Sequence, residues 1–275
     1  MGIYAGICAA HGLKDPDMQT QTSWWPLRPR WTITLLVLAL LAVIEAITRL
    51  GLVPAVILSS PTKVAGVLWQ IVVSGKVFPD LWRTTWEVVL SVLLAIAVGV
   101  PIGFGLWRTP LLGRVLEPYL VGTYAMPLVL FYPFLLVVFG LGATPVILIA
   151  ASMGLIPVIL NSWAAFQQVP DIYFRVCASF RCTGARRFRR VIFPAAAPMI
   201  FAGFKLCLIY SFVGVIVMEF MVGNIGLGFR VAYDYDGFKI DEMYAYVTII
   251  IALAAIVTVI LTRGEARIRG EINNG

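Results

Sequence analysis

The chain has 275 residues, of which 60% are hydrophobic and only 13% are charged, and its net charge at pH 7 is +7. A soluble domain carries about twice that share of charged residues, so the composition predicts an all-α integral membrane protein. The basic residues gather beside apolar segments rather than on a soluble face, which argues for the lipid bilayer and against nucleic acid as a partner.

The chain lacks the residues that most catalytic and metal sites need. Its four cysteines form no CxxC pair and its one histidine, His11, lies near the N-terminus, so neither a metal site nor a Ser-His-Asp relay is expected. No GxxxxGK[ST] sequence occurs, so the chain has no P-loop for ATP. We therefore expect no catalytic residue and no cofactor on this chain, with ATP and Mg on a partner subunit if energy is used.

Apolar stretches of bilayer-spanning length predict six transmembrane helices. They lie at about 33–48, 87–106, 118–139, 144–166, 198–222 and 243–262. After Ser60 and Pro61, apolar residues repeat at helical spacing over about 14 residues, which predicts a shorter, interfacial helix. The glycines and proline at 99–105 are expected to loosen the second half of span two.

The distribution of Lys and Arg predicts the orientation of the spans. If both termini lie on one side, that side holds 14 basic residues and the other holds 6. Because cytoplasmic loops carry the excess of Lys and Arg, we expect both termini to be cytoplasmic. The predicted organisation is an N-terminal segment at 1–30, a transmembrane domain at 31–265 and a C-terminal tail at 266–275.

One loop stands out between two of these spans. Residues Pro170–Pro198 carry six arginines and end in a Pro-Ala-Ala-Ala-Pro run. One interpretation is that the loop only anchors this side of the protein in the cytoplasm. The other is that it is a docking element for a soluble partner.

The same loop resembles the signature loop of permease subunits of bacterial ABC importers. That pattern is Glu-Ala-Ala, three residues, Gly, nine residues, Ile, any residue and Leu-Pro. The tail from Val191 to Pro194 matches it, whereas Arg175 stands at the position of the Glu and Arg181 at that of the Gly. A gapped placement uses Gly184 for the glycine, with a shorter spacing to Pro194.

Further stretches resemble the branch of this family that imports nitrate, sulfonates and taurine. The resemblance extends over about residues 35–265, and the order and spacing of the motifs carry it. The motifs are Ser60–Val64, Gly99–Gly103, Tyr124–Pro127 with Phe139–Gly142, and Glu219 followed by Gly226–Phe229. Tyr124–Pro127 stands where the family has a kink, so the resemblance implies a kink there.

The resemblance implies a type I ABC importer permease in the bacterial inner membrane, which pairs with a second permease copy as a homodimer. Its loop at 170–194 would form a coupling helix on a cytoplasmic ABC ATPase, and an extracytoplasmic binding protein would deliver the solute. Val176, Phe180 and Phe188 are expected as exposed apolar contacts. The residues expected in the coupling loop are Arg175, Val176, Cys177, Phe180, Arg181, Gly184, Arg186, Arg187, Phe188 and Pro194.

The branch resemblance favours a small anion, such as nitrate or a sulfonate, as the solute. Neutral or cationic thiamine precursors are the alternative within the family. Two alternatives lie outside this family: a channel or secondary carrier without an ATPase, and a membrane enzyme acting on lipid. No internal repeat supports a secondary carrier, and no cluster of polar groups supports an enzyme.

Several polar and aromatic residues within the spans are candidates for a translocation path, each with a structural alternative. Glu219 has a gating role or is simply exposed at the interface, and Lys205 contacts solute or reaches to the interface. Asn161 and Ser162 are expected to hydrogen-bond between helices. Asp234, Asp236, Asp241 and Glu242 are expected to form an acidic outer loop. The full set of path candidates is Tyr124, Met126, Tyr132, Asn161, Lys205 and Glu219.

Overall fold

The computed structural model describes residues 29–54, 56–179 and 184–273, and all regular structure in these ranges is helical. The chain divides into two units, residues 1–54 and 55–275. The first unit contains α2 (Pro29–Arg49), whose 21 apolar-rich residues suffice to cross a bilayer. Near its end the Arg49 Nε lies 2.5 Å from the Glu45 Oε1, an ion pair between side chains one turn apart.

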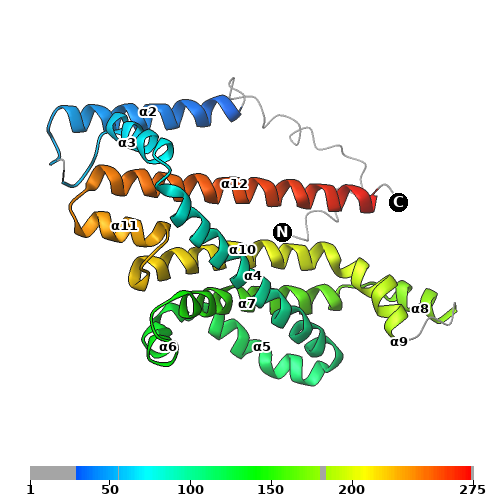
Figure 1. Cartoon of the computed structure of the whole chain (residues 1–275). Coiled ribbons are helices and arrows are strands. Elements are labelled where there is room, and N and C mark those ends of the chain that lie inside the picture. The colour runs from blue at the N-terminus through cyan, green and yellow to red at the C-terminus, as the bar shows by residue number, and fades with distance from the viewer. Residues whose placement is uncertain (1–28, 55, 180–183, 274–275) are drawn as a thin grey trace, which may run out of the picture. The chain divides into compact units, whose positions relative to one another are not determined.

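The second unit contains the other helices (Figure 1). They are α3 (Pro61–Val73), α4 (Val77–Arg108), α5 (Pro110–Ala125), the 3₁₀-helix η2 (Leu128–Phe131), α6 (Tyr132–Phe139), α7 (Ala143–Gln167), α8 (Asp171–Ser179), α9 (Gly184–Arg187), the π-helix η3 (Phe188–Ile192), α10 (Phe193–Val222), α11 (Leu227–Asp236) and α12 (Ile240–Asn273). Among the described residues, five helical segments are long and apolar enough to span a membrane, and the bent pair α5–α6 makes six. Five of the six predicted spans are thus confirmed as apolar helices of spanning length, and the bent pair gives the sixth if it is counted as one span. The predicted division at residues 30 and 265 stays a prediction.

The core of the second unit forms around α7, which packs mainly against α4 and α10. A helix enclosed in this way is apolar on all sides, as α7 is. A Cβ atom on Gly103 of α4 would lie 2.7 Å from the Cβ of Ser162 on α7, so glycine permits close approach of the two helices. The prediction that the glycines loosen span two is therefore wrong, because α4 is continuous to Arg108 and uses Gly103 for packing.

The third predicted span is interrupted. The helix begins at Pro110 rather than at Pro118, ends at Ala125, and meets the segment Leu128–Phe139 at an angle of 84°. Met126 has extended backbone angles of φ −80° and ψ 134°, as expected of a residue that precedes a proline. The kink predicted at Tyr124–Pro127 is thus confirmed, and its cause is Pro127.

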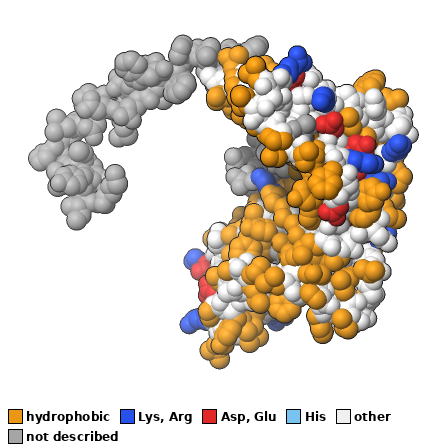
Figure 2. All heavy atoms as spheres, turned by 90° about the vertical axis from the view of Figure 1, so that its left-hand side faces the viewer, with side chains coloured by type: hydrophobic (Ala, Val, Ile, Leu, Met, Phe, Trp, Pro, Cys, Tyr) orange, Lys and Arg blue, Asp and Glu red, His pale blue; other side chains and the backbone are white. Residues whose placement is uncertain are grey.

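The surface of the protein suits a lipid environment. Apolar side chains cover much of the face that Figure 2 shows, with acidic and basic side chains gathered mainly at its upper right and at its lower left edge. Such extensive exposed apolar area is rare on soluble monomers. Within the second unit, α11 and the α8–α9 segment lie at opposite ends of the paired helices α7 and α10 (Figure 1). A site at α11 and a site at the α8–α9 segment are therefore at opposite ends of these spans.

Candidate functional site

The first candidate site is the surface formed by α8 and the segment that leads into α10. Helix α8 begins after Pro170, and the negative Asp171 carboxylate in its first turn stabilises the helix by interacting with the positive end of the helix dipole. Ile172, Tyr173 and Val176 are exposed, with 46% of Val176 accessible, whereas Cys177 on the same helix is buried. Val176 therefore lies where an exposed apolar contact was predicted, and its binding to an ATPase stays a prediction.

Behind this surface lies an aromatic cluster made of Phe104, Trp107, Phe166, Phe174 and Phe188. Phe104 of α4 contacts Phe188 with ring centroids 4.6 Å apart and Phe166 of α7 at 5.4 Å. Trp107 stacks on Phe174 of α8 at 6.3 Å. Offset and tilted ring pairs of this kind stabilise beyond their buried area, so the cluster fixes the loop to the membrane helices.

One expectation about the loop changes with this cluster. Phe188 packs inward against Phe104 and Phe166, so the prediction that it is an exposed contact is wrong. Phe180 and Arg181 lie outside the described residues. Sequence reasoning missed Phe104 and Trp107, although their spacing of three places both on one face at the end of an apolar helix.

The loop enters α10 through the π-helix η3. The N–H of Phe193 donates to the carbonyl of Phe188 five residues earlier, which is the spacing of a π-turn. Pro194 follows, and because proline has no N–H it cannot donate to the preceding turn. The resemblance placed Pro194 at the end of the signature, and the structure places it in the first turn of α10.

The arginines of the loop divide into two groups. Arg175, Arg186, Arg189 and Arg190 are exposed, whereas Arg187 is half-buried and its guanidinium lies 5.4 Å from the centre of the Phe174 ring. Gly184 begins α9 with φ +58°, a left-handed conformation that favours glycine. This backbone requirement agrees with the gapped placement of the signature, in which Gly184 is the glycine.

The second candidate site is a buried polar cluster at the start of α11, here named the α11 cap. The first backbone N–H groups of a helix have no partner within it. In the α11 cap the N–H of Gly226 donates to the Asp80 Oδ1 (3.1 Å), that of Leu227 to the Thr84 Oγ1 (2.9 Å) and that of Gly228 to the Glu219 Oε2 (2.8 Å). Side chains of α4 and α10 thus provide acceptors for three N–H groups at the start of a third helix.

Further bonds connect the members of the α11 cap. The Thr84 hydroxyl donates to the Glu219 carboxylate, 2.7 Å from Oε1, and the Arg230 Nε donates to the Asp80 Oδ2 at 2.8 Å. Glu219 is only 1% exposed, so the alternative that it is simply exposed at the interface is wrong. Its role in gating stays a prediction.

Sequence reasoning missed Asp80 and Thr84, because the predicted second span began at Glu87. The signal was present, since Asp80, Thr84 and Glu87 recur at spacings of four and three and share one face of α4. All three are buried, and the Arg83 Nε lies 2.6 Å from the Glu87 Oε1. A polar stripe on a helix of this length indicates contact with another part of the protein rather than with lipid.

The acidic residues before the last span do not form a loop. Asp234 and Asp236 lie in α11, which the sequence did not predict, and Asp241 and Glu242 lie in the first turn of α12. Asp234 is 2% exposed, so it offers no contact to a partner, and the Asp241 Oδ1 accepts a hydrogen bond from the Ser59 hydroxyl. The prediction of an acidic outer loop is therefore wrong.

The path candidates do not gather in one place. Tyr124 contacts Tyr210 of α10, with ring centroids 5.3 Å apart, and Met126 is exposed at the break of the third span. Tyr132 packs against the main core, and Lys205 is half-buried in α10. Glu219 belongs to the α11 cap, so these residues lie at several separate places in the second unit.

Asn161 does not form the expected bond between helices. Its Nδ2 donates to the carbonyl of Pro157, 2.8 Å away and one turn earlier on α7. A side chain that donates to a carbonyl one turn earlier bonds within its own helix and joins no second helix. A Cβ atom on Gly203 would lie 2.7 Å from the Asn161 Cβ, so Asn161 marks a close approach of α7 and α10.

Comparison with protein families decides what kind of protein carries these features. The family described as "binding-protein-dependent transport system inner membrane component" matches residues 91–269, which include α7, the α8–α10 segment and the α11 cap residues of α10 and α11. The chain belongs to this family. It is a transport permease of the inner membrane and not an enzyme, and the ATPase of such an importer is a separate subunit.

Known relatives share this permease's sequence at low identity. The riboflavin transport system permease RibX of Chloroflexus aurantiacus is 30% identical over 64% of this chain and 65% of its own length. The taurine transport system permease TauC of Escherichia coli is 25% identical over 84% and 86%. The permease also has the fold of a chain in an inward-facing structure of the MetNI methionine ABC transporter, with a TM-score of 0.59 at 20% identity, over 70% of this chain and 95% of that one.

Proposed function

We propose that this permease forms the membrane path of an ATP-driven importer and changes its accessibility when an ATPase moves the α8–α9 segment. The observation that carries the proposal is the α8 surface. It exposes Ile172, Tyr173 and Val176 outward, while on its inner side Phe174 contacts Trp107 of α4, which in turn contacts Phe166 of α7. A movement imposed on α8 would therefore reach α4 directly and α7 through Trp107.

The proposed assembly has a second copy of the chain, cytoplasmic ATPase subunits and an extracytoplasmic binding protein. Both termini and the α8–α9 segment would lie in the cytoplasm, which the excess of Lys and Arg on that side supports. The end that carries α11 would then face outward, toward the binding protein. ATP and Mg would be held by the ATPase.

Site-directed crosslinking tests the coupling surface. The four native cysteines are replaced, and a single cysteine is placed at Val176 in membranes that also contain the presumptive ATPase. We expect a crosslink between the two proteins that changes with ATP. A cysteine at Val137, which is 87% exposed on α6, serves as the matched control and should give none. A folded, inserted permease that forms no crosslink from Val176 would contradict the proposal.

For the solute, we propose a small organic anion of the sulfonate type. The taurine permease, which aligns over most of both chains, supports this class. The riboflavin permease, at 30% identity, supports a larger neutral solute as the second candidate. Uptake of labelled taurine and of labelled riboflavin by cells with and without the permease separates the two, because only the correct solute should show uptake that depends on the chain and on ATP.

A further inference from the structure

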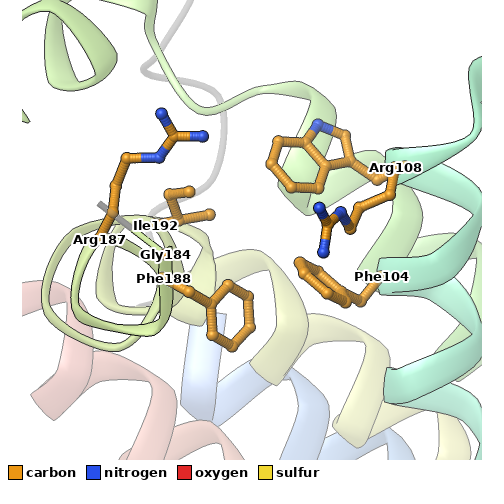
Figure 3. A pocket seen from close by; sticks show the side chains of 7 residues that line it. Phe104, Arg108, Gly184, Arg187, Phe188 and Ile192 are labelled. Atoms are coloured by element: carbon orange, nitrogen blue, oxygen red, sulfur yellow. The ribbon is translucent and has the colours of Figure 1, made fainter. Parts of the chain in front are cut away.

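A pocket of about 670 Å³ lies between the end of α4 and the α9–η3 segment. Its floor is aromatic, formed by part of the aromatic cluster, and two arginines stand at its sides, Arg108 from α4 and Arg187 from α9 (Figure 3). We name it the two-arginine pocket. Its lining residues are Phe104, Trp107, Arg108, Gly184, Arg187, Phe188 and Ile192.

The two arginines have no carboxylate to balance them among the residues that the structure describes. Arg108 lies over the Phe104 ring at 5.9 Å and Arg187 over the Phe174 ring at 5.4 Å, and no described salt bridge includes either. Two like charges beside one apolar-floored cavity raise the local positive potential, because low-dielectric walls screen them poorly. Such a cavity attracts an anion.

The chemistry of the lining indicates which anion fits. Guanidinium groups bind phosphate oxygens with two parallel hydrogen bonds, and they do so better than an ammonium group. Below them the rings of Phe104 and Phe188, with centroids 4.6 Å apart, offer apolar contact but no further charge. A Cβ atom on Gly184 would meet no atom of the described residues within 4 Å, its own helix backbone and chain neighbours aside, so the described side of the pocket at Gly184 has space for a ligand.

The position of the pocket adds a second constraint. Arg108 is the last residue of the membrane-spanning helix α4, and Arg187 lies just before the segment that leads into the span α10. Both arginines therefore lie at the level where spans leave the bilayer, where phospholipid headgroups are found. We propose that the two-arginine pocket binds the phosphate group of an anionic amphiphile, with a membrane phospholipid as its source.

A lipid in this pocket would contact α4 through Arg108 and the loop through Arg187. It would thus connect the same two elements that the aromatic cluster joins. The alternative is that both arginines are only topological anchors, whose guanidinium groups stay in water. In that case any exposed arginine at this end of the protein would contribute to phospholipid binding as much as these two.

Native mass spectrometry of the purified full chain, titrated with dioleoyl phosphatidylglycerol, tests the proposal. Dioleoylglycerol, which has the same acyl chains without the phosphate, is the lipid control, and glycerol 3-phosphate is the soluble probe. We compare Arg108→Gln/Arg187→Gln with the matched pair Arg114→Gln/Arg186→Gln. The matched pair removes the same charge from exposed residues that do not line the pocket.

We expect phosphatidylglycerol to bind more tightly than dioleoylglycerol. The pocket variant should lower its affinity by about tenfold for each arginine removed, because each loses a charged hydrogen bond, whereas the control pair should change it less than about twofold. Arg108→Lys/Arg187→Lys keeps both charges and should bind phosphatidylglycerol more tightly than the Gln variant but less tightly than the native chain, because an ammonium group holds phosphate less well than a guanidinium group. Equal melting temperatures of the Gln variant and the native chain in detergent show that the loss is not a folding defect.

The soluble probe and the control variants decide the source of the phosphate and whether the proposal is wrong. If glycerol 3-phosphate binds as tightly and depends on the same two arginines, the phosphate site stands and its source is a soluble ester instead of a lipid. If the pocket variant and the control pair bind phosphatidylglycerol equally well, the proposal is wrong. It is also wrong if dioleoylglycerol binds as tightly as phosphatidylglycerol.

Discussion

The two ends of the α7–α10 pair are stabilised in different ways. At one end, the α11 cap joins α4, α10 and α11 through buried hydrogen bonds of 2.7–3.1 Å. At the other end, the loop from α8 to η3 is joined to α4 and α7 by ring contacts of Phe174 and Phe188, with centroids 4.6–6.3 Å apart. Hydrogen bonds demand fixed distances and angles, whereas apolar ring contacts tolerate small displacements.

The directional bonds at one end and the ring contacts at the other suit different tasks, holding helices in place and transmitting movement. The α11 cap holds three helices in one arrangement, because moving any of them would leave buried donors without acceptors. The ring contacts at the loop end tolerate small displacements, so a movement of the loop can pass to α4 and α7 without breaking a directional bond. We therefore expect substitutions in the α11 cap to reduce stability and substitutions at the loop end to reduce coupling.

The largest expected effect is that of Gly226→Ala in the α11 cap. Gly226 has φ +128°, which side chains rarely tolerate, and an added Cβ would overlap the Glu219 carboxyl group. Strain and displacement of a buried carboxylate together should lower the free energy of unfolding by about 4 kcal/mol. Thermal unfolding in detergent, followed by size-exclusion chromatography, measures this effect.

Gly122→Ala is the matched control for that experiment. Gly122 lies in α5, has a helical backbone, and has no atom within 4 Å of the added Cβ. Alanine is the better helix former, so this variant should be as stable as the native chain or slightly more stable. Equal stability of Gly226→Ala and Gly122→Ala would show that the α11 cap is not tightly packed.

The next effect is that of Thr84→Val, which keeps the side-chain shape and removes the hydroxyl. It leaves the Leu227 N–H and the Glu219 carboxylate without the partner that Thr84 provides. Unsatisfied buried groups of this kind should lower the free energy of unfolding by about 2–3 kcal/mol. The control is Thr85→Val, since Thr85 is exposed and bonds only to the carbonyl of Leu81 on its own helix. A loss of similar size in both variants would contradict the proposed role of Thr84.

The helical fold was largely predictable from the sequence, and the contrast between the two ends was not. Long apolar runs predicted the spans, because each run must satisfy its backbone within one helix in a bilayer. The kink at Pro127 was also predictable, since a proline acts through its immediate neighbours. Helix α11 was missed because Asp234 and Asp236 suggested an exposed loop, while its start depends on Asp80, 146 residues before Gly226.

The candidate sites show the same limit. The loop was found from its arginines and from Pro194, which are local signals. The inward position of Phe188 was not predictable, because it depends on Phe104 and Phe166 in two other helices. The burial of Glu219 likewise depends on Thr84 of α4 and on the glycines that allow α11 to approach it.

At the loop end, Phe104→Leu should affect coupling more than stability. Leucine keeps an apolar side chain but loses the ring contacts to Phe166 and Phe188. We expect a loss of about 1–1.5 kcal/mol in unfolding free energy. In the assembled transporter, we also expect solute-stimulated ATPase activity to fall while basal activity stays the same. Phe134→Leu, at a position 65% exposed on α6, is the control. If solute still stimulates the ATPase activity fully in Phe104→Leu, the ring contacts of Phe104 are not needed for coupling.

The smallest effect on stability is expected from Val176→Asp, which changes only the outer surface of α8. Because Val176 is 46% exposed, the melting temperature should stay within the error of the measurement. An apolar contact with the ATPase would nevertheless lose affinity by about tenfold, since the charge would have to be desolvated on binding. Leu141→Asp, at a position 78% exposed between α6 and α7, adds the same charge at the other end of α7 and should leave ATPase association unchanged. If both variants bind the ATPase like the native chain, α8 is not its docking surface, and the ring contacts behind α8 serve only to hold the loop in place.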